Sequence, residues 1–205
     1  MRVSYIRRWK TKASRPNTNA AAALAAGEYL ALTDHDDVLA PHAVYEMMKA
    51  AHETGAGVSV QRRGVVHFGR APAHGRPLQP DFAPDYLNCC NYICHFSVFQ
   101  KALFDAVGGL DPACDGSQDH DLFLKLSERA VPVHVPKVLY YWRVHAASTS
   151  GGTAAKPYVE KAAQKAVADH ARPPQGGRAG WSRANSRAPA MWCGTFPSRS
   201  RSCQF

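Results

Sequence analysis

The chain has 205 residues, a formal net charge of +9 and a hydrophobic fraction of 45%, and this length can bury one sizeable core. The positive charge lies at the ends: residues 1–16 hold six Lys or Arg and residues 173–205 hold five Arg, both without acids, whereas the middle has 14 basic against 16 acidic residues. Since no basic stripe follows a predicted helix, nucleic acid is excluded as a partner.

Helices and strands alternate along the predicted chain. In order, we predict a helix over 17–26, a strand over 28–33, a helix over 41–53, a strand over 91–99, helices over 101–107 and 121–128, strands over 133–135 and 139–144, and a helix over 157–170. This alternation predicts an α/β sheet layered with helices. The last 33 residues are rich in Gly, Ser, Arg and Pro without periodicity, which predicts a disordered C-terminal tail.

Three carboxylates follow the predicted strand over 28–33. Asp34, Asp36 and Asp37 come at the carboxyl end of a strand, where α/β folds place ligands, and clustered acids repel one another unless a cation lies among them. All-oxygen ligands suit Mg²⁺ or Mn²⁺, which commonly also hold a substrate diphosphate. The alternative is an acidic loop that caps the helix starting at Pro41. The motif alone leaves both interpretations open.

A second acidic cluster favours the catalytic interpretation. Asp119 and Asp121 lie at the start of the helix predicted near 121–128, where capping accounts for one carboxylate but does not need both. A carboxylate there, close to a metal-bound substrate, is a candidate general base for an acceptor hydroxyl.

Five motifs resemble, in order and spacing, those of the family 2 glycosyltransferases. They are residues 34–37, 91–95, 107–111, 115–122, and 139–145 with 148–149. The resemblance covers about residues 17–170 and is greatest to members that build bacterial O-antigen, rhamnan and cell-wall polysaccharides. It implies an inverting enzyme with a GT-A, Rossmann-like mixed sheet.

The resemblance also implies roles for single residues. Asp34 and Asp36 match the metal-binding D-x-D element, which Asp37 extends, and Asp119 matches the catalytic base. In-line attack by the acceptor hydroxyl would then invert the anomeric carbon. The implied cofactor is Mn²⁺ or Mg²⁺.

Three residues are expected at the nucleotide-sugar site by the same resemblance: Asn19, Asp34 and His145. His145 matches a histidine that faces the diphosphate or the metal, although the residues alone favour a hydrogen-bonded structural histidine at a strand end. The implied donor is a nucleotide-diphosphate sugar, and the implied acceptor is a saccharide or a lipid-linked molecule.

The chain departs from the family pattern in two places. Residues 1–16, expected as a basic extension, do not supply the two further βα units with which the family begins, so we expect a partial GT-A domain over 17–172. Residues 58–77 lack acids and are expected to be a divergent loop. We hypothesise an internal start and frame-shifted translation at 58–77 and 173–205, and we expect the chain alone not to transfer sugar.

Three classes of function remain open: an active glycosyltransferase, a catalytically inactive fragment of one, and a metal-dependent phosphohydrolase or nuclease. The last usually needs further closely spaced His or Asp ligands. The six cysteines form no paired C-x-x-C elements, so free thiols in a reducing cytoplasm are expected. No apolar run approaches the ~20 residues of a membrane span and no signal peptide fits, so the expected location is cytoplasmic, with at most peripheral membrane association.

Overall fold

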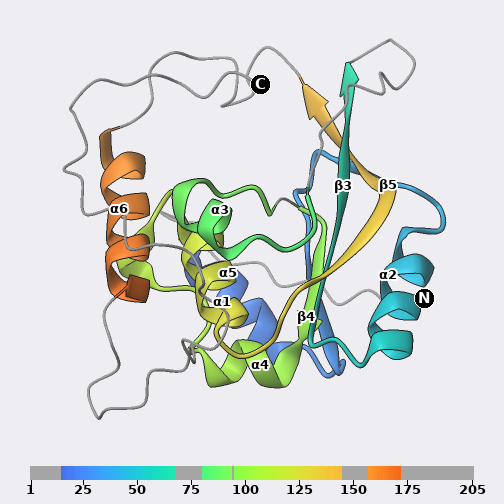
Figure 1. The fold of residues 1–205 in the computed structure, drawn as a ribbon, viewed down its shortest axis with the longest axis horizontal. Coiled ribbons are helices and arrows are strands. Elements are labelled where there is room, and N and C mark those ends of the chain that lie inside the picture. Colours follow the sequence, from blue (N-terminus) through green and yellow to red (C-terminus); the bar gives the residue numbers. More distant parts are fainter. Residues whose placement is uncertain (1–14, 68–79, 94, 145–156, 172–205) are drawn as a thin grey trace, which may run out of the picture. The chain divides into compact units, whose positions relative to one another are not determined.

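The computed structural model describes residues 15–67, 80–93, 95–144 and 157–171 (Figure 1). The elements in these ranges are α1 (Arg15–Leu24), β1 (Tyr29–Leu32), β2 (Val38–Leu39), α2 (Ala43–Thr54), β3 (Val58–His67), α3 (Pro84–Cys89), β4 (Ser97–Gln100), α4 (Lys101–Ala106), the 3₁₀ turn η1 (Pro112–Cys114), α5 (Gln118–Ser127), β5 (Val133–Val144) and α6 (Pro157–Ala171). They agree with most of the predicted elements and confirm the α/β class. None of the helices in the described ranges combines the length and the apolar character needed to cross a bilayer.

The five strands form one mixed sheet in the order β1-β4-β3-β5-β2. β3 and β5 are parallel, whereas the other three pairs are antiparallel. Because β1 and β2 lie at opposite edges, the short loop that joins them crosses the ends of the three strands between. This loop contains the acidic motif.

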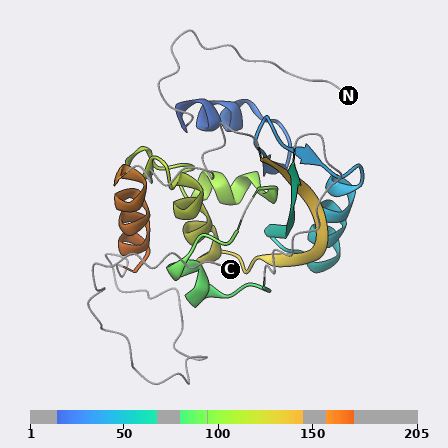
Figure 2. The same ribbon diagram turned by 90° about the horizontal axis from the view of Figure 1, so that it is seen from above.

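Each face of the sheet has its own apolar core. On one face, side chains of β3 and β4 pack with α3, α4, α5 and η1. On the other, α2 packs with β5 and with Phe96 and Val98 around β4. Figure 2 shows α2 on one side of the sheet and α4 and α5 on the other. Burial on both faces makes this a three-layer arrangement in which the strand ends remain available for a site.

Residues 58–67 form the long strand β3, whereas the sequence suggested a divergent loop over 58–77. The buried amide of Gln61 explains how a polar residue fits there. Gln61 is 1% exposed, its Nε2 donates to the carbonyl of His95 at 3.0 Å, and its Oε1 accepts from the backbone N–H of Leu139 at 3.1 Å. An amide whose nitrogen and oxygen each have a hydrogen-bond partner can be buried at little cost. Residues 68–77 lie outside the described residues.

Strand β5 runs through Pro136, where the sequence suggested a break between two strands. The register with β3 shifts at this point, because Gln61 pairs with Val135 and Arg62 with Val138. Proline has no N–H for the ladder, and the irregularity accommodates it within one continuous strand. A strand was predicted over 91–99, but strand β4 begins only at Ser97. Residues 91–93, 95 and 96 form neither helix nor strand.

Candidate functional site

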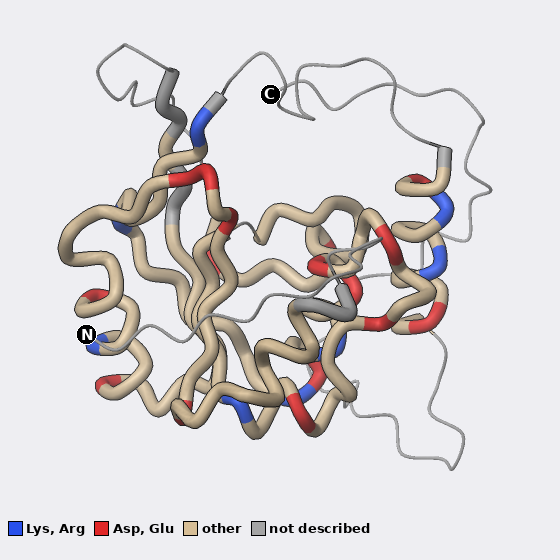
Figure 3. Tube along the Cα trace, turned by 180° about the vertical axis from the view of Figure 1, so that it is seen from behind, with Lys and Arg blue, Asp and Glu red and all other residues tan. Residues whose placement is uncertain are grey.

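The acidic loop consists of residues 33–37, between the end of β1 and the start of β2. Carboxylate oxygens of Asp34, Asp36 and Asp37 lie within 4.8 Å of one another, so the three side chains gather as the sequence predicted. Figure 3 shows the acidic residues of this loop in red, at one end of the sheet. Oxygens this close form a ligand set suited to a hard divalent cation.

Tyr140 on β5 holds both ends of the acidic loop. This side chain is 1% exposed; its hydroxyl donates to Asp37 and accepts from the backbone N–H of Asp34 at 3.4 Å. Burial, followed by the hydrogen bond to Asp37, raises the pKa of Tyr140, so the hydroxyl keeps its proton. The other Asp37 oxygen accepts from the backbone N–H of Arg143 at 2.8 Å. Asp37 therefore ties the loop to β5.

His95 lies beside Asp34 because of the pairing between β1 and β4. The last residue of β1, Leu32, pairs with Ser97 at the start of β4, and this register brings the residues just outside the two strands together. Nε2 of His95 is 3.7 Å from Oδ1 of Asp34, with side-chain exposures of 36% and 51%. Sequence patterns placed His95 only within a motif, although antiparallel pairing of these strands would have predicted its contact with Asp34.

Asp119 lies at the start of α5, as predicted, and both of its oxygens accept hydrogen bonds. Oδ1 accepts from the backbone N–H of His120, and Oδ2 accepts from the amide Nδ2 of Asn91, each at 2.9 Å. The sequence did not predict the contact between Asn91 and Asp119.

Segment 91–95 links the two acidic sites. Asn91 contacts Asp119, and His95 lies beside Asp34. Four residue steps span at most about 14 Å. The predicted metal ligand and the predicted base therefore lie beside the two ends of one short segment.

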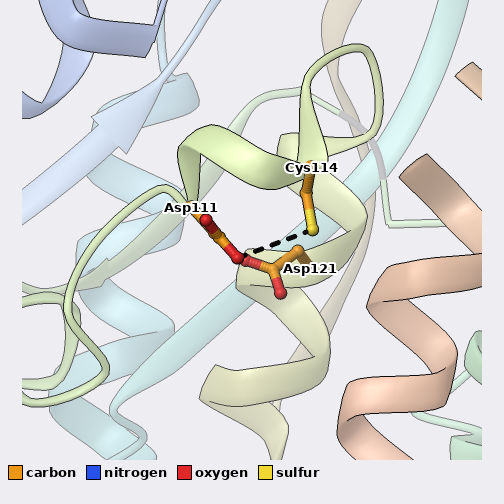
Figure 4. A group of neighbouring side chains, drawn as sticks. All are labelled: Asp111, Cys114 and Asp121. Atoms are coloured by element: carbon orange, nitrogen blue, oxygen red, sulfur yellow. Dashed lines mark hydrogen bonds between the residues drawn. The ribbon is translucent and has the colours of Figure 1, made fainter. Parts of the chain in front are cut away.

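A second cluster of ligand-type atoms involves Asp111, Cys114 and Asp121 (Figure 4), which also lie within 4.8 Å of one another. Lys125 contacts Asp121 at 2.6 Å, and Lys165 lies 3.5 Å from Asp111. Burial, then the charges of Asp121 and Asp111, raises the pKa of the Cys114 thiol to about 11. Carboxylates already paired with lysines and a protonated thiol are poor cation ligands. We interpret this cluster as an ion-pair contact that joins η1, α5 and α6.

Two residues expected at the nucleotide-sugar site, Asn19 and His145, stay predictions. The amide of Asn19 donates to the carbonyl of Leu110 at 2.9 Å and accepts from its N–H at 3.0 Å. Both ends of this side chain thus fasten α1 to the turn before η1, and a role of Asn19 at the nucleotide-sugar site stays a prediction. His145 lies outside the described residues.

Comparison with known proteins gives three kinds of match. Residues 1–108 match the profile described as glycosyl transferase family 2, a range that starts at residue 1 and spans 58–77. The O-antigen biosynthesis protein RfbC of Myxococcus xanthus is 31% identical over 156 residues, which are 75% of this chain and 12% of that protein. A chondroitin synthase of Pasteurella multocida is 32% identical over 145 residues, which are 67% of this chain and 15% of that protein. The chain thus spans less than a fifth of these relatives.

Among solved structures, TarS 1-349 of S. aureus in complex with UDP-GlcNAc superposes with a TM-score of 0.60 at 14% identity, over 77% of this chain and 46% of that one. The complex of the same protein with UDP gives a TM-score of 0.58 at 15% identity, over 77% and 45%. At identities this low, the superpositions show the fold alone. They confirm the expected GT-A-like mixed sheet.

Proposed function

Because the chain belongs to glycosyl transferase family 2, we propose that it carries the metal-binding and acid–base part of a sugar-transferring enzyme. The donor is a nucleotide-diphosphate sugar, the acceptor is a saccharide or a lipid-linked molecule, and the anomeric carbon is inverted. The observation that carries this proposal is segment 91–95, which contacts Asp34 at one end and Asp119 at the other. A metal-bound diphosphate and a general base need this proximity.

The relatives support the class of substrate. RfbC is named for O-antigen biosynthesis and the Pasteurella protein for chondroitin synthesis, which favours a polysaccharide product for this chain. The TarS structures with UDP and UDP-GlcNAc favour a nucleotide-diphosphate donor. Bacterial surface polysaccharide synthesis, in the cytoplasm or at the membrane surface, is therefore the proposed setting.

Asp34 and Asp36 are the proposed ligands of Mn²⁺ or Mg²⁺, and His145 is proposed as a further contact of the metal or the diphosphate. The fit rests on the all-oxygen set within 4.8 Å. When bound, the ion supplies positive charge that stabilises the departing diphosphate. Asp37 fixes the loop through Tyr140 and Arg143, which keeps the ligand oxygens together before the ion arrives.

Asp119 is the proposed general base. It takes the proton of the acceptor hydroxyl while the acceptor oxygen bonds to the anomeric carbon, and the bond from that carbon to the diphosphate oxygen breaks on the opposite side. Hydrogen bonds from His120 and Asn91 orient the carboxylate, and each oxygen keeps a further lone pair for this proton.

Two alternatives were open from the sequence. Family membership argues against the phosphohydrolase or nuclease. A catalytically inactive fragment that binds metal weakly remains the competing hypothesis, and the experiment must distinguish it from a competent site.

The test compares Asp36→Ala with the control Asp85→Ala, which removes an exposed carboxylate on α3. Mn²⁺ binding is measured by calorimetry on the 205-residue chain. Transfer of sugar from several nucleotide sugars is measured on this chain and on a fusion that places a family nucleotide-binding part before it. Asp36→Ala should weaken Mn²⁺ binding at least ~10-fold and abolish most transfer, whereas Asp85→Ala should change neither.

Equal Mn²⁺ affinity and transfer in Asp36→Ala and Asp85→Ala would contradict the metal assignment. Mn²⁺ binding without transfer in either protein form would favour the inactive fragment.

A further inference from the structure

The contact between Asn91 and Asp119 has a fixed direction. An ionised carboxylate only accepts hydrogen bonds, so Asn91 must face Oδ2 of Asp119 with its amide N–H group, at the observed 2.9 Å. This orientation leaves Oδ1 of Asn91 buried without a hydrogen-bond partner among the described residues. The amide therefore satisfies the carboxylate while one of its own polar atoms stays unsatisfied.

A buried acceptor without a donor lowers the stability of the folded state. An amide that served packing alone would be expected to satisfy both of its polar ends, as the amide of Gln61 does with His95 and Leu139. The difference between the buried amide of Gln61 and the half-buried amide of Asn91, whose Oδ1 alone is buried, indicates that the Asn91 N–H group is directed at Asp119 for a purpose other than stability.

We infer that Asn91 is a positioning residue for the carboxylate of Asp119; this rests on the proposed role of Asp119 as the general base. Two donors fix the plane of the carboxylate, since His120 N–H holds Oδ1 at the start of α5 and Asn91 holds Oδ2 from segment 91–95.

Charged groups lie on α5 itself and on the elements that contact it, which are η1, α3 and α6. They are Asp121 and Lys125 on α5, Asp111 and Asp115 beside η1, Asp85 on α3, and Lys165 on α6, with the His120 ring bonded to the carbonyl of Leu87. Replacing Asn91 by the similarly shaped Leu changes none of these charges. A change in the titration of Asp119 would therefore report the lost amide donor.

The test follows the side-chain carboxyl carbon of Asp119 by NMR in the 205-residue chain, labelled with ¹³C-aspartate and assigned by the loss of this resonance in Asp119→Asn. In Asn91→Leu, the titration midpoint should move to higher pH, because the carboxylate loses a donor. Asn88→Ala on α3 is the matched control and should leave the midpoint unchanged. Equal midpoints in Asn91→Leu and the parent chain would overturn the inference.

Should Asn91→Leu fail to fold, Asn91→Asp keeps the side-chain shape and replaces the donor by a second carboxylate. The repulsion should then move the joint titration of the pair to still higher pH. An unmoved Asp119 resonance in that variant would also overturn the inference.

Transfer kinetics separate this inference from the proposed function. In the fusion enzyme, Asn91→Leu should lower kcat about 10-fold, leave the donor KM unchanged and move the acidic limb of the pH profile upward, whereas a purely structural role would lower stability without moving the limb. If Asp119→Asn keeps full turnover, the base assignment fails whatever Asn91 does. If Asp119→Asn is inactive but Asn91→Leu leaves both the titration and the profile unchanged, the positioning role alone fails.

Discussion

Tyr140→Phe should release the acidic loop while the aromatic ring stays in the core. The change removes the hydroxyl that donates to Asp37 and accepts from Asp34 N–H, and the ring position is 1% exposed. A hydrogen bond to a charged group contributes about 1.5–3 kcal/mol, and the 3.4 Å contact with Asp34 is too long to add much. We therefore expect the free energy of unfolding to fall by about 2 kcal/mol.

Urea denaturation at pH 7 measures this loss, and Mn²⁺ titration of the folded chain measures its effect on the loop. Mn²⁺ affinity should fall together with stability, because a released loop must lose more conformational freedom to bind the ion. Tyr141→Phe is the matched control: its neighbouring ring is half-buried and packs against Gly64, so the change should stay within about 0.5 kcal/mol. If the two variants unfold alike and bind Mn²⁺ alike, Tyr140 does not hold the loop.

Asp119→Asn in the fusion enzyme should lower kcat by about 10² to 10⁴-fold with donor affinity unchanged. A normal rate in a single-turnover assay would mean that Asp119 only caps the start of α5. Folding raises the pKa of the Cys114 thiol from 9.0 to about 11, because the fold favours the protonated form. This contribution to the free energy of unfolding is complete below pH 9 and is lost as the pH rises through 11. The stability advantage of the parent chain over Cys114→Ala should thus shrink by about 2–3 kcal/mol between pH 8 and pH 11.5, and a constant difference in urea denaturation would contradict it. Gly109→Ala should destabilise by at least about 2 kcal/mol, because a Cβ there would lie 2.9 Å from Oδ1 of Asn19 at φ +67°. Gly55→Ala, at φ +66° with no atom within 4 Å, should cost only about 1 kcal/mol, and equal melting temperatures for the two variants would refute the clash.

The sequence predicted the parts of the site that depend on local order. An apolar run followed directly by Asp34, Asp36 and Asp37 suffices to place carboxylates at a strand end, and the structure gathers them as predicted. Asp119 was likewise predicted at a helix start, because acids favour that position. Both predictions needed only a few consecutive residues and the element they adjoin.

The sequence did not predict the contacts that depend on how distant segments pair. In the central strand β3, Gln61 forms hydrogen bonds with His95 and Leu139, which are separated from it by 34 and 78 positions in the sequence. Because Gln61 is polar, apolar alternation did not predict a strand here. The Asn91–Asp119 contact spans 28 positions. The amide of Asn19 contacts the backbone of Leu110, 91 positions further along the chain. Such contacts arise from tertiary packing, which local patterns do not encode.

The acidic loop joins the two outermost strands of the sheet, and this makes it a tether as well as a site. Fraying of either edge strand, β1 or β2, pulls one end of the five-residue loop away from its partner residues. An ion held by the loop would therefore slow the opening of both edge strands at once, although three strands lie between them in the sheet. Amide hydrogen exchange in β1 and β2 should slow together as Mn²⁺ is added, while exchange in the distant helix α6 should be unaffected.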